Sequence, residues 1–318
     1  SAVATTSAIG SFMLPEMKKA GYEPNFSAAV TAAASTTGML IPPSNILIVY
    51  AIASGGVSIA ALFMAGYIPG IMVGLALMLV CFIYAKMKGY PLSPRLPIKV
   101  VVEKTIAALP SLFLIFLVIG GIVGGVFTAT EAGAIAVVYS LLLAVVFYKE
   151  VDAKALPDIF LKAAETTAIV MLLIAASTAM SWLLSFENIP QTLSNALLSI
   201  SDNPLLILLL INLLLIVVGA FLDMTPAVLI FTPIFLPVAL ELGMSELQFG
   251  IMLVLNLSIG LCSPPVGAVL FITCAIAKTK LENIIRPLIP LYVAMFVVLM
   301  LVTYVAWFSE ALPRALGF

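Results

Sequence analysis

GMLIPPS at residues 38–44 and GLCSPPV at residues 260–266 each interrupt a long apolar stretch with the same Gly-x-x-x-Pro-Pro pattern. Inside a membrane, backbone that leaves the helix is tolerated only where protein or a water-filled cavity satisfies its polar groups. Two such interruptions in corresponding positions are the best pointer in a sequence to the binding site of a transporter. We interpret both stretches as breaks in membrane-spanning helices, and we call them the first break (38–44) and the second break (260–266).

The two breaks belong to an internal repeat. Five Gly and Pro residues of the first unit recur 222 positions later in the second, as in 264 minus 42. The pairs are Gly38 and Gly260, Pro42 and Pro264, Pro43 and Pro265, Pro15 and Pro237, and Gly21 and Gly243. The repeated unit is therefore predicted to be a helical hairpin, a broken helix and a further apolar helix. The alignment puts Ser1 inside the first hairpin, so we expect the chain to begin partway through the first unit.

The composition predicts an all-α polytopic membrane protein. Hydrophobic residues make up 63% of the chain and charged residues 9%, which excludes an ordinary soluble domain. Histidine is absent and the net charge is −1, so we expect neither histidine-based catalysis nor nucleic-acid binding. The segment pair 203–222 and 226–240 flanks a polar tip, which favours a re-entrant hairpin over two full spans. The other candidate apolar segments are 46–53, 59–85, 106–127, 132–148, 166–185, 248–277 and 287–308.

The charges predict the orientation. We place the loop with Lys18 and Lys19 in the cytoplasm and let the chain cross the membrane at each predicted span in turn. Every Lys and Arg except Arg314 then lies on the cytoplasmic side. This is the positive-inside asymmetry of membrane proteins. The same path places the two hairpins on opposite sides of the membrane. The sequence therefore predicts inverted repeats, each with a re-entrant hairpin and a broken transmembrane helix.

The breaks offer oxygen atoms that could bind a hard cation such as Na⁺. Proline removes a backbone donor, so Pro42 and Pro43 deprive the carbonyls of Gly38 and Met39 of their helical partners. Free carbonyls at the end of a half-helix attract cations. An alternative interpretation is that each break is only a kink that eases packing. The predicted ligands are Gly38, Ile41 and Ser44 at the first break, and Gly260, Ser263 and Val266 with the hairpin-tip residue Gly219 at the second.

Polar residues near the hairpins and breaks are candidates for substrate binding. An ionisable group such as Asp223 is energetically costly at a hairpin tip within the membrane, which favours a role in binding or transport. The alternative is that Asp223 serves as the N-cap of the following helix. The hydroxyl groups have the alternative role of helix packing. Glu131 fits a capping box with Thr128. The predicted substrate-binding residues are Ser1, Thr5, Thr36, Asp223 and Thr225.

Several stretches together resemble the large membrane subunit of the tripartite ATP-independent periplasmic (TRAP) transporters, within the ion-transporter superfamily. They are SAVATTSAIGSFMLPEMKKAGY (1–22), AAVTAAASTTGMLIPPS (28–44), TATEAGAIAVVYS (128–140), GAFLDMTPAVLIFTPIFLP (219–237) and NLSIGLCSPPVG (256–267). The resemblance covers most of the chain. The family subunit is longer at its N-terminus.

The resemblance implies a multi-pass permease of the bacterial inner membrane. It implies import of an organic acid, such as a C4-dicarboxylate or sialic acid, driven by Na⁺ bound at two or more sites. It implies two partners, which are a soluble periplasmic binding protein that delivers the substrate and a small four-helix membrane subunit. A related Na⁺-coupled carboxylate transporter that works without a binding protein is the alternative, and an intramembrane hydrolase is disfavoured because Asp223 stands alone.

The resemblance also implies an elevator mechanism, in which hairpins and broken helices form a mobile transport domain. The basic stretch 86–104 reads independently as an arm at the surface of anionic lipid. The predicted division is 1–58 and 203–278 for the transport domain, 59–105 for a scaffold helix with the interfacial arm, 106–202 for connecting and scaffold helices, and 279–318 for an arm and the last scaffold helix.

Overall fold

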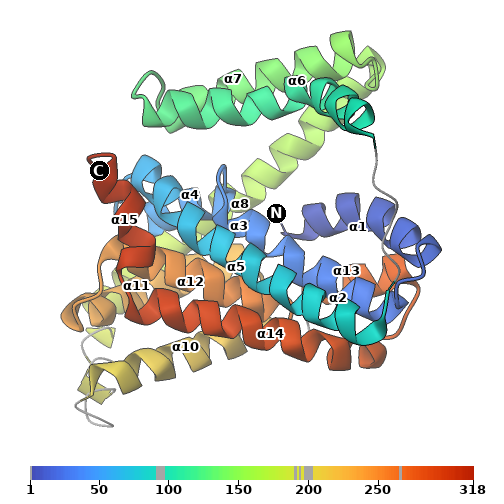
Figure 1. Cartoon of the computed structure of the whole chain (residues 1–318). Helices are drawn as coiled ribbons and strands as arrows, with labels where there is room; N and C mark the ends of the chain where they lie inside the picture. Colours follow the sequence, from blue (N-terminus) through green and yellow to red (C-terminus); the bar gives the residue numbers. More distant parts are fainter. Residues whose placement is uncertain (1, 91–96, 190–191, 193–194, 197–202, 265–266) are drawn as a thin grey trace. The chain divides into compact units, whose positions relative to one another are not determined.

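The chain is built from helices, as the composition predicted. A computed structural model describes residues 2–90, 97–189, 192, 195–196, 203–264 and 267–318 (Figure 1). Within these residues, seven helices are long and apolar enough to cross a membrane, and no strand occurs. The count rises to eight if the bent pair at the first break forms one span. The prediction of an all-α polytopic membrane protein is therefore confirmed.

The chain forms two compact units, and both repeats lie in the first, which comprises residues 1–90 and 173–318. The helices of the first repeat are α1 (Ala2–Lys19), α2 (Pro24–Ser35), α3 (Thr37–Leu40), α4 (Asn45–Ala53) and α5 (Ile59–Lys88). Those of the second are α10 (Pro204–Phe221), α11 (Met224–Glu241), α12 (Glu246–Leu261), α13 (Ala268–Ala277), α14 (Leu281–Tyr304) and α15 (Trp307–Ala315).

The helix boundaries reproduce the repeat. Helix α11 lies 222 positions after α1 at both ends, because 224 minus 2 equals 241 minus 19. The first residues of α2 and α12, and of α5 and α14, have the same offset. Gly21 and Gly243 end the equivalent helices α1 and α11 with φ of 83° and 85°. Such backbone favours glycine, which explains why this residue recurs at both places.

The two repeats run in opposite directions. The Tyr50 hydroxyl at the end of α4 donates a 2.7 Å hydrogen bond to the Glu246 carbonyl at the start of α12. At the other end of the unit, the Thr279 hydroxyl after α13 donates a 2.8 Å bond to Asn25 Oδ1 in the first turn of α2. Each broken helix therefore begins where the other ends. Helices α5 and α14 are likewise antiparallel neighbours (Figure 1).

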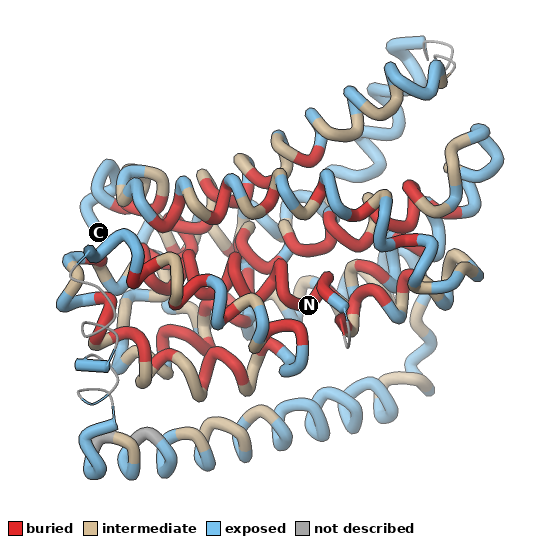
Figure 2. The backbone as a smooth tube through the Cα atoms, turned by 90° about the horizontal axis from the view of Figure 1, so that it is seen from below, coloured by how far each residue is buried: buried red, intermediate tan, exposed pale blue. Residues whose placement is uncertain are grey.

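Helix α12 is the core of the first unit. Every residue from Gln248 to Leu261 is buried, and α10, α11, α5 and α14 all contact this helix (Figure 2). Two amides fix its position: Asn256 Nδ2 donates to the carbonyl and to Oδ1 of Asn212 on α10, at 2.9 and 2.8 Å. Asn212 Nδ2 in turn lies 3.3 Å from the Thr303 hydroxyl on α14. Three helices thus share one buried polar network.

The second unit, residues 91–172, carries apolar helices with little burial. It holds α6 (Ile98–Val123), α7 (Ala129–Leu141), a π-helical turn (Leu142–Phe147) and the first part of α8 (Leu156–Phe186). The predicted capping box at the start of α7 is confirmed, since Thr128 and Glu131 bond reciprocally. Residues 98–104 of the predicted interfacial arm form the first turns of α6, while residues 91–96 lie outside the described residues.

The C-terminal segment contains a helix that the sequence did not indicate. After Tyr304 the chain turns and forms the short amphipathic helix α15. Its buried Glu310 binds Arg314, the single basic residue predicted on the outer side, and accepts a hydrogen bond from the Ser245 hydroxyl. The exception to the charge asymmetry is therefore neutralised by an ion pair. Helices α5 and α14 belong to the same compact unit as the broken helices, and the division into transport domain and scaffold stays a prediction.

Candidate functional site: two helix breaks

The first break bends its helix by 51°. Pro42 and Pro43 cannot donate to the helix, so α3 ends at Leu40 and α4 begins only at Asn45. The Met39 carbonyl, which loses the Pro43 donor, instead accepts a 2.6 Å hydrogen bond from the Ser44 hydroxyl. A lone pair of the Ser44 oxygen stays open for a further ligand.

The first break packs against glycines of α5. A Cβ on Gly66 would lie 2.2 Å from the Leu40 carbonyl oxygen, and one on Gly70 would lie 2.5 Å from Ile41 Cγ1. Gly38 faces the hairpin helix α1, where the Thr5 hydroxyl is 3.6 Å from its ideal Cβ position. The spacing of Gly66 and Gly70 is the small-xxx-small pattern of close helix contacts, which is the signal that could have identified them.

The second break packs against its own hairpin. The ideal Cβ of Gly260 would lie 2.6 Å from the Cα of Gly219 on α10, so the two backbones touch. The Gly260 carbonyl accepts the Ser263 N–H at 2.8 Å. The Ser263 hydroxyl donates to the Ile259 carbonyl at 3.0 Å and contacts the Tyr292 hydroxyl of α14. The structure thus brings Gly219, Gly260 and Ser263 together, and their role as cation ligands stays a prediction.

The candidate substrate residues lie in unlike surroundings. Thr5 is partly buried beside Gly38, whereas Thr36 is fully buried, with its hydroxyl 2.7 Å from the Ala33 carbonyl and 3.6 Å from Met295 Sδ. The hydroxyl of Thr36 thus serves packing between α2 and α14. Ser1 and the cation candidate Val266 lie outside the described residues.

Asp223 occupies the N-cap position of α11 without capping it through its side chain. The backbone carbonyl of Asp223 accepts the Ala227 N–H, but its exposed carboxylate makes no capping hydrogen bond. Thr225, two residues further on, is partly buried. The side chain of Asp223 therefore does not cap α11, which was one of its two interpretations. Its carboxylate is accessible at the hairpin tip.

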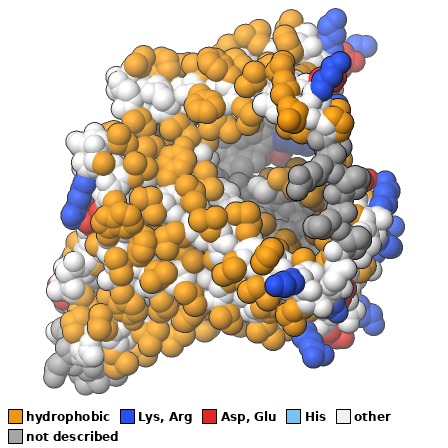
Figure 3. Space-filling view, in the orientation of Figure 1, with side chains coloured by type: hydrophobic (Ala, Val, Ile, Leu, Met, Phe, Trp, Pro, Cys, Tyr) orange, Lys and Arg blue, Asp and Glu red, His pale blue; other side chains and the backbone are white. Residues whose placement is uncertain are grey.

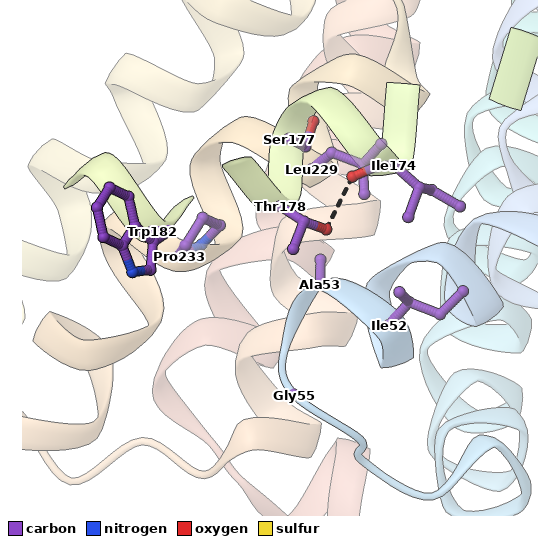
Figure 4. Close-up of a pocket in the computed structure, with 9 residues that line it drawn as sticks. All are labelled: Ile52, Ala53, Gly55, Ile174, Ser177, Thr178, Trp182, Leu229 and Pro233. Carbon is purple, nitrogen blue, oxygen red and sulfur yellow. Dashed lines mark hydrogen bonds between the residues drawn. The ribbon is translucent and has the colours of Figure 1, made fainter. Parts of the chain in front are cut away.

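A separate cavity lies where α4, α8 and α11 meet within the first unit (Figure 4). It has a volume of about 370 Å³ and is lined by the end of α4, by Ser177, Thr178 and Trp182 of α8, and by Leu229 and Pro233 of α11. The Thr178 hydroxyl donates to the Ile174 carbonyl at 2.8 Å. None of the residues predicted to bind cation or substrate lines this cavity, so it is not the predicted site.

Comparison with known proteins places the chain in a family. Residues 1–308 match the family model described as the DctM component of the tripartite ATP-independent periplasmic transporter. The chain is 49% identical to the uncharacterized protein YgiK of Salmonella typhimurium, over 98% of this chain and 72% of that protein. It is 38% identical to the C4-dicarboxylate TRAP transporter large permease protein DctM of Pseudomonas aeruginosa, over 100% and 74%.

A further relative, of which the chain covers about half, matches as well. The chain is 39% identical to the isethionate TRAP transporter permease protein DctMQ of Oleidesulfovibrio alaskensis, over 95% of this chain and 48% of that protein. The antiparallel broken helices, the hairpins and these matches agree with the resemblance seen in the sequence. The chain belongs to the large permease subunits of the tripartite ATP-independent periplasmic transporters.

Proposed function

We propose that this protein imports an organic acid across the bacterial inner membrane, driven by a Na⁺ gradient. The observation that carries the proposal is the contact of Gly219 with Gly260, which sets a hairpin tip directly against a helix break. At this contact the Gly260 carbonyl, which accepts the Ser263 N–H, and the Ser263 hydroxyl lie next to the hairpin backbone. Such oxygen ligands suit hard cations.

The two breaks would provide two cation sites. At the first, the carbonyls of Gly38 and Ile41 would act with the Ser44 hydroxyl, which already turns its proton toward Met39. At the second, Gly219, Gly260 and Ser263 would act with the carbonyl of Val266. The proton of Ser263 points to Ile259, so its oxygen would likewise face the ion as an acceptor.

The substrate would be a small organic anion. The names of the relatives give C4-dicarboxylate and isethionate, which are both anionic. Among the described residues no Lys or Arg side chain is buried, so hydroxyl groups and helix N-termini would contact the anion. Thr5 and Thr225, next to the first break and at the start of α11, are the candidates for these contacts. Asp223 would order the tip or stabilise the cation rather than touch the anion.

The family implies two partners for this permease. A periplasmic binding protein would deliver the substrate, and a small membrane subunit would complete the transporter. Elevator movement would carry the hairpins and broken helices across the membrane. The predicted scaffold helices α5 and α14 pack against both broken helices, and the movement would take place at these contacts.

Uptake by the full-length protein, reconstituted with its two partners in liposomes, tests the proposal. Uptake of labelled succinate should require an inward Na⁺ gradient and the binding protein. Equal uptake in K⁺-only buffer would contradict Na⁺ coupling. Undiminished uptake without the binding protein would instead favour a transporter that works alone.

A further inference from the structure

A small cavity opens at the end of the first unit where α1 ends, α2 begins and α13 ends. Its volume is about 270 Å³. The hydrogen bond from Thr279 to Asn25 ties the end of α13 to the start of α2 beside it. The cavity is remote in sequence from both breaks, and nothing in the proposed transport cycle uses it.

Two lysines line this cavity, Lys18 in the last turn of α1 and Lys278 just after α13. Among the described residues neither lysine is in an ion pair, although acids are near in sequence. Those acids have other partners: Glu16 binds Lys19 at 2.7 Å, and Glu23 binds Lys88 at 3.2 Å. In Figure 3, Lys and Arg side chains gather at the end of the unit where Figure 1 shows the start of α2. Among the described residues both cavity lysines are therefore without an ion-pair partner, although Glu282 in the first turn of α14 lies only four residues after Lys278.

The first turn of α2 adds to this positive potential. Pro24 and Ser27 of that turn line the cavity, and no side chain caps the helix. The N-terminus of a helix carries partial positive charge and unbonded N–H groups, which favour anions. Pro24 has no N–H, and the N–H and hydroxyl of Ser27 both donate to the Glu23 carbonyl, so the two ammonium groups are the donors that face this space.

Much of the remaining lining of the cavity is apolar. Leu14, Pro15, Ile276 and Ala277 form this part. A ligand that matches both parts has an anionic head and a hydrocarbon body.

The repeat supplies an internal comparison. At the offset of 222, Lys18 corresponds to Leu240, Lys278 to Gly56, and Pro24 to Glu246. The equivalent place at the opposite end of the unit therefore lacks both lysines, while each helix start has one acid, Glu23 before α2 and Glu246 in the first turn of α12. The positive charge is thus specific to the end that the charge asymmetry places in the cytoplasm. The cytoplasmic leaflet is the one rich in anionic lipid.

We propose that this cavity binds the phosphate headgroup of an anionic phospholipid from the cytoplasmic leaflet. Lys18 and Lys278 pair with the phosphate, and the acyl chains lie against the apolar part of the cavity lining. Basic pockets between helices on the cytoplasmic side are a recurring form of lipid headgroup site. The proposal is independent of Na⁺ coupling and of the identity of the substrate.

Lipid titration of the purified full-length protein in detergent tests this site. The probes are short-chain phosphatidylglycerol, phosphatidylcholine of equal chain length, and glycerol 3-phosphate as the free headgroup. Binding is read from the rise in Tm with lipid concentration. Phosphatidylglycerol should raise the Tm, and the other two should not. Lys18→Gln or Lys278→Gln should weaken the apparent Kd for phosphatidylglycerol about fivefold each, and both together about thirtyfold.

Lys104→Gln, an exposed lysine of the second unit, removes the same charge elsewhere and should leave the apparent Kd unchanged. The pair Lys18→Arg and Lys278→Arg keeps the charges and should retain binding, which separates loss of charge from misfolding. Wild-type affinity in the double Gln variant would overturn the proposal. Equal binding of glycerol 3-phosphate would overturn the lipid assignment and identify a site for soluble anions.

Discussion

The two helix breaks have the same Gly-x-x-x-Pro-Pro pattern but are held by different neighbours. The first break presses its Leu40 carbonyl against Gly66 of α5, the helix that follows it in the chain. The second presses Gly260 against Gly219 of α10, within its own hairpin. At the position equivalent to Gly66, the second repeat has Leu288. An inverted repeat in the sequence therefore does not produce two identical sites.

The ends of the two repeats also differ in their contacts. At one end Glu23, just before α2, binds Lys88 at the end of α5 and accepts a 2.5 Å hydrogen bond from Tyr84. At the equivalent positions 222 residues later, Ser245 binds Glu310. The first contact joins the start of α2 to the last turn of α5, and the second joins the start of α12 to α15, the short helix after α14. In the first repeat the carboxylate belongs to the residue before the broken helix, and in the second it belongs to the other residue of the pair. A contact between the equivalent positions exists in both repeats.

The largest effect is expected from Gly66→Ala. The new methyl group would overlap a backbone oxygen that cannot rotate away, so we expect a loss of about 3 kcal/mol in the free energy of unfolding. Gly74→Ala on the same helix is the control, because its Cβ would meet nothing within 4 Å. Removing a helical glycine there should stabilise by up to about 1 kcal/mol. Thermal unfolding in detergent compares them, and equal Tm values would contradict the packing of the first break.

Gly260→Ala and Gly38→Ala compare the breaks directly. A methyl group on Gly260 would separate the second break from its hairpin, at a cost of about 2 kcal/mol and with loss of uptake. At Gly38 the nearest neighbour of an added Cβ is the Thr5 hydroxyl at 3.6 Å, an ordinary contact, so uptake should persist. Succinate uptake in liposomes measures both. Loss of uptake in both variants to the same degree would show that the breaks are packed alike.

Asn256→Ala removes a polar contact that only the second repeat has. The equivalent residue in the first repeat is Ala34. The substitution leaves Asn212 Oδ1 without its donor, and hydrogen bonds between membrane helices contribute about 1 kcal/mol. Ala34→Asn is the matched control and should change stability by less than about 0.5 kcal/mol, because Ala34 is exposed. A neutral Asn256→Ala would mean that the network does not stabilise the core.

The smallest effect is expected at Glu23, whose carboxylate is partly exposed. The hydrogen bond from Tyr84, with a further contribution from Lys88, lowers the pKa of Glu23 below its ordinary value of 4.5. A lowered folded-state pKa stabilises above the ordinary value, and this stabilisation is lost as the pH falls below 4.5 through the folded-state pKa. Glu23→Gln should therefore flatten the acid limb of the Tm profile. Glu103→Gln should leave it unchanged, and identical profiles for wild type and Glu23→Gln would contradict the contact.

Much of the fold could be predicted from local chemistry. Proline at 42 and 43 must end a helix, glycine at 21 and 243 suits the left-handed turn, and the Thr128–Glu131 spacing makes a cap. Each of these signals depends on only a few neighbouring residues, so it can be recognised in the sequence. The repeat offset of 222 relates the helix boundaries of the two repeats, and the charges predicted that the repeats run in opposite directions.

The environment of the site could be predicted only in part. The alignment suggested that Gly219 lies at the second break, and the structure places it there. It did not reveal that Tyr292 contacts Ser263, that Ser44 bonds back to Met39, or that Thr36 is buried against Met295. These contacts join residues of different helices or depend on the exact path of non-helical backbone. No periodic pattern encodes them.

The sequence by itself determined that this chain is a membrane protein with two inverted broken helices, because hydrophobicity, proline and glycine act locally. The tertiary structure alone decided which helix holds each break and which polar groups face one another. Whether a glycine is essential depends on what lies opposite its missing Cβ. That neighbour comes from α5 at the first break and from α10 at the second.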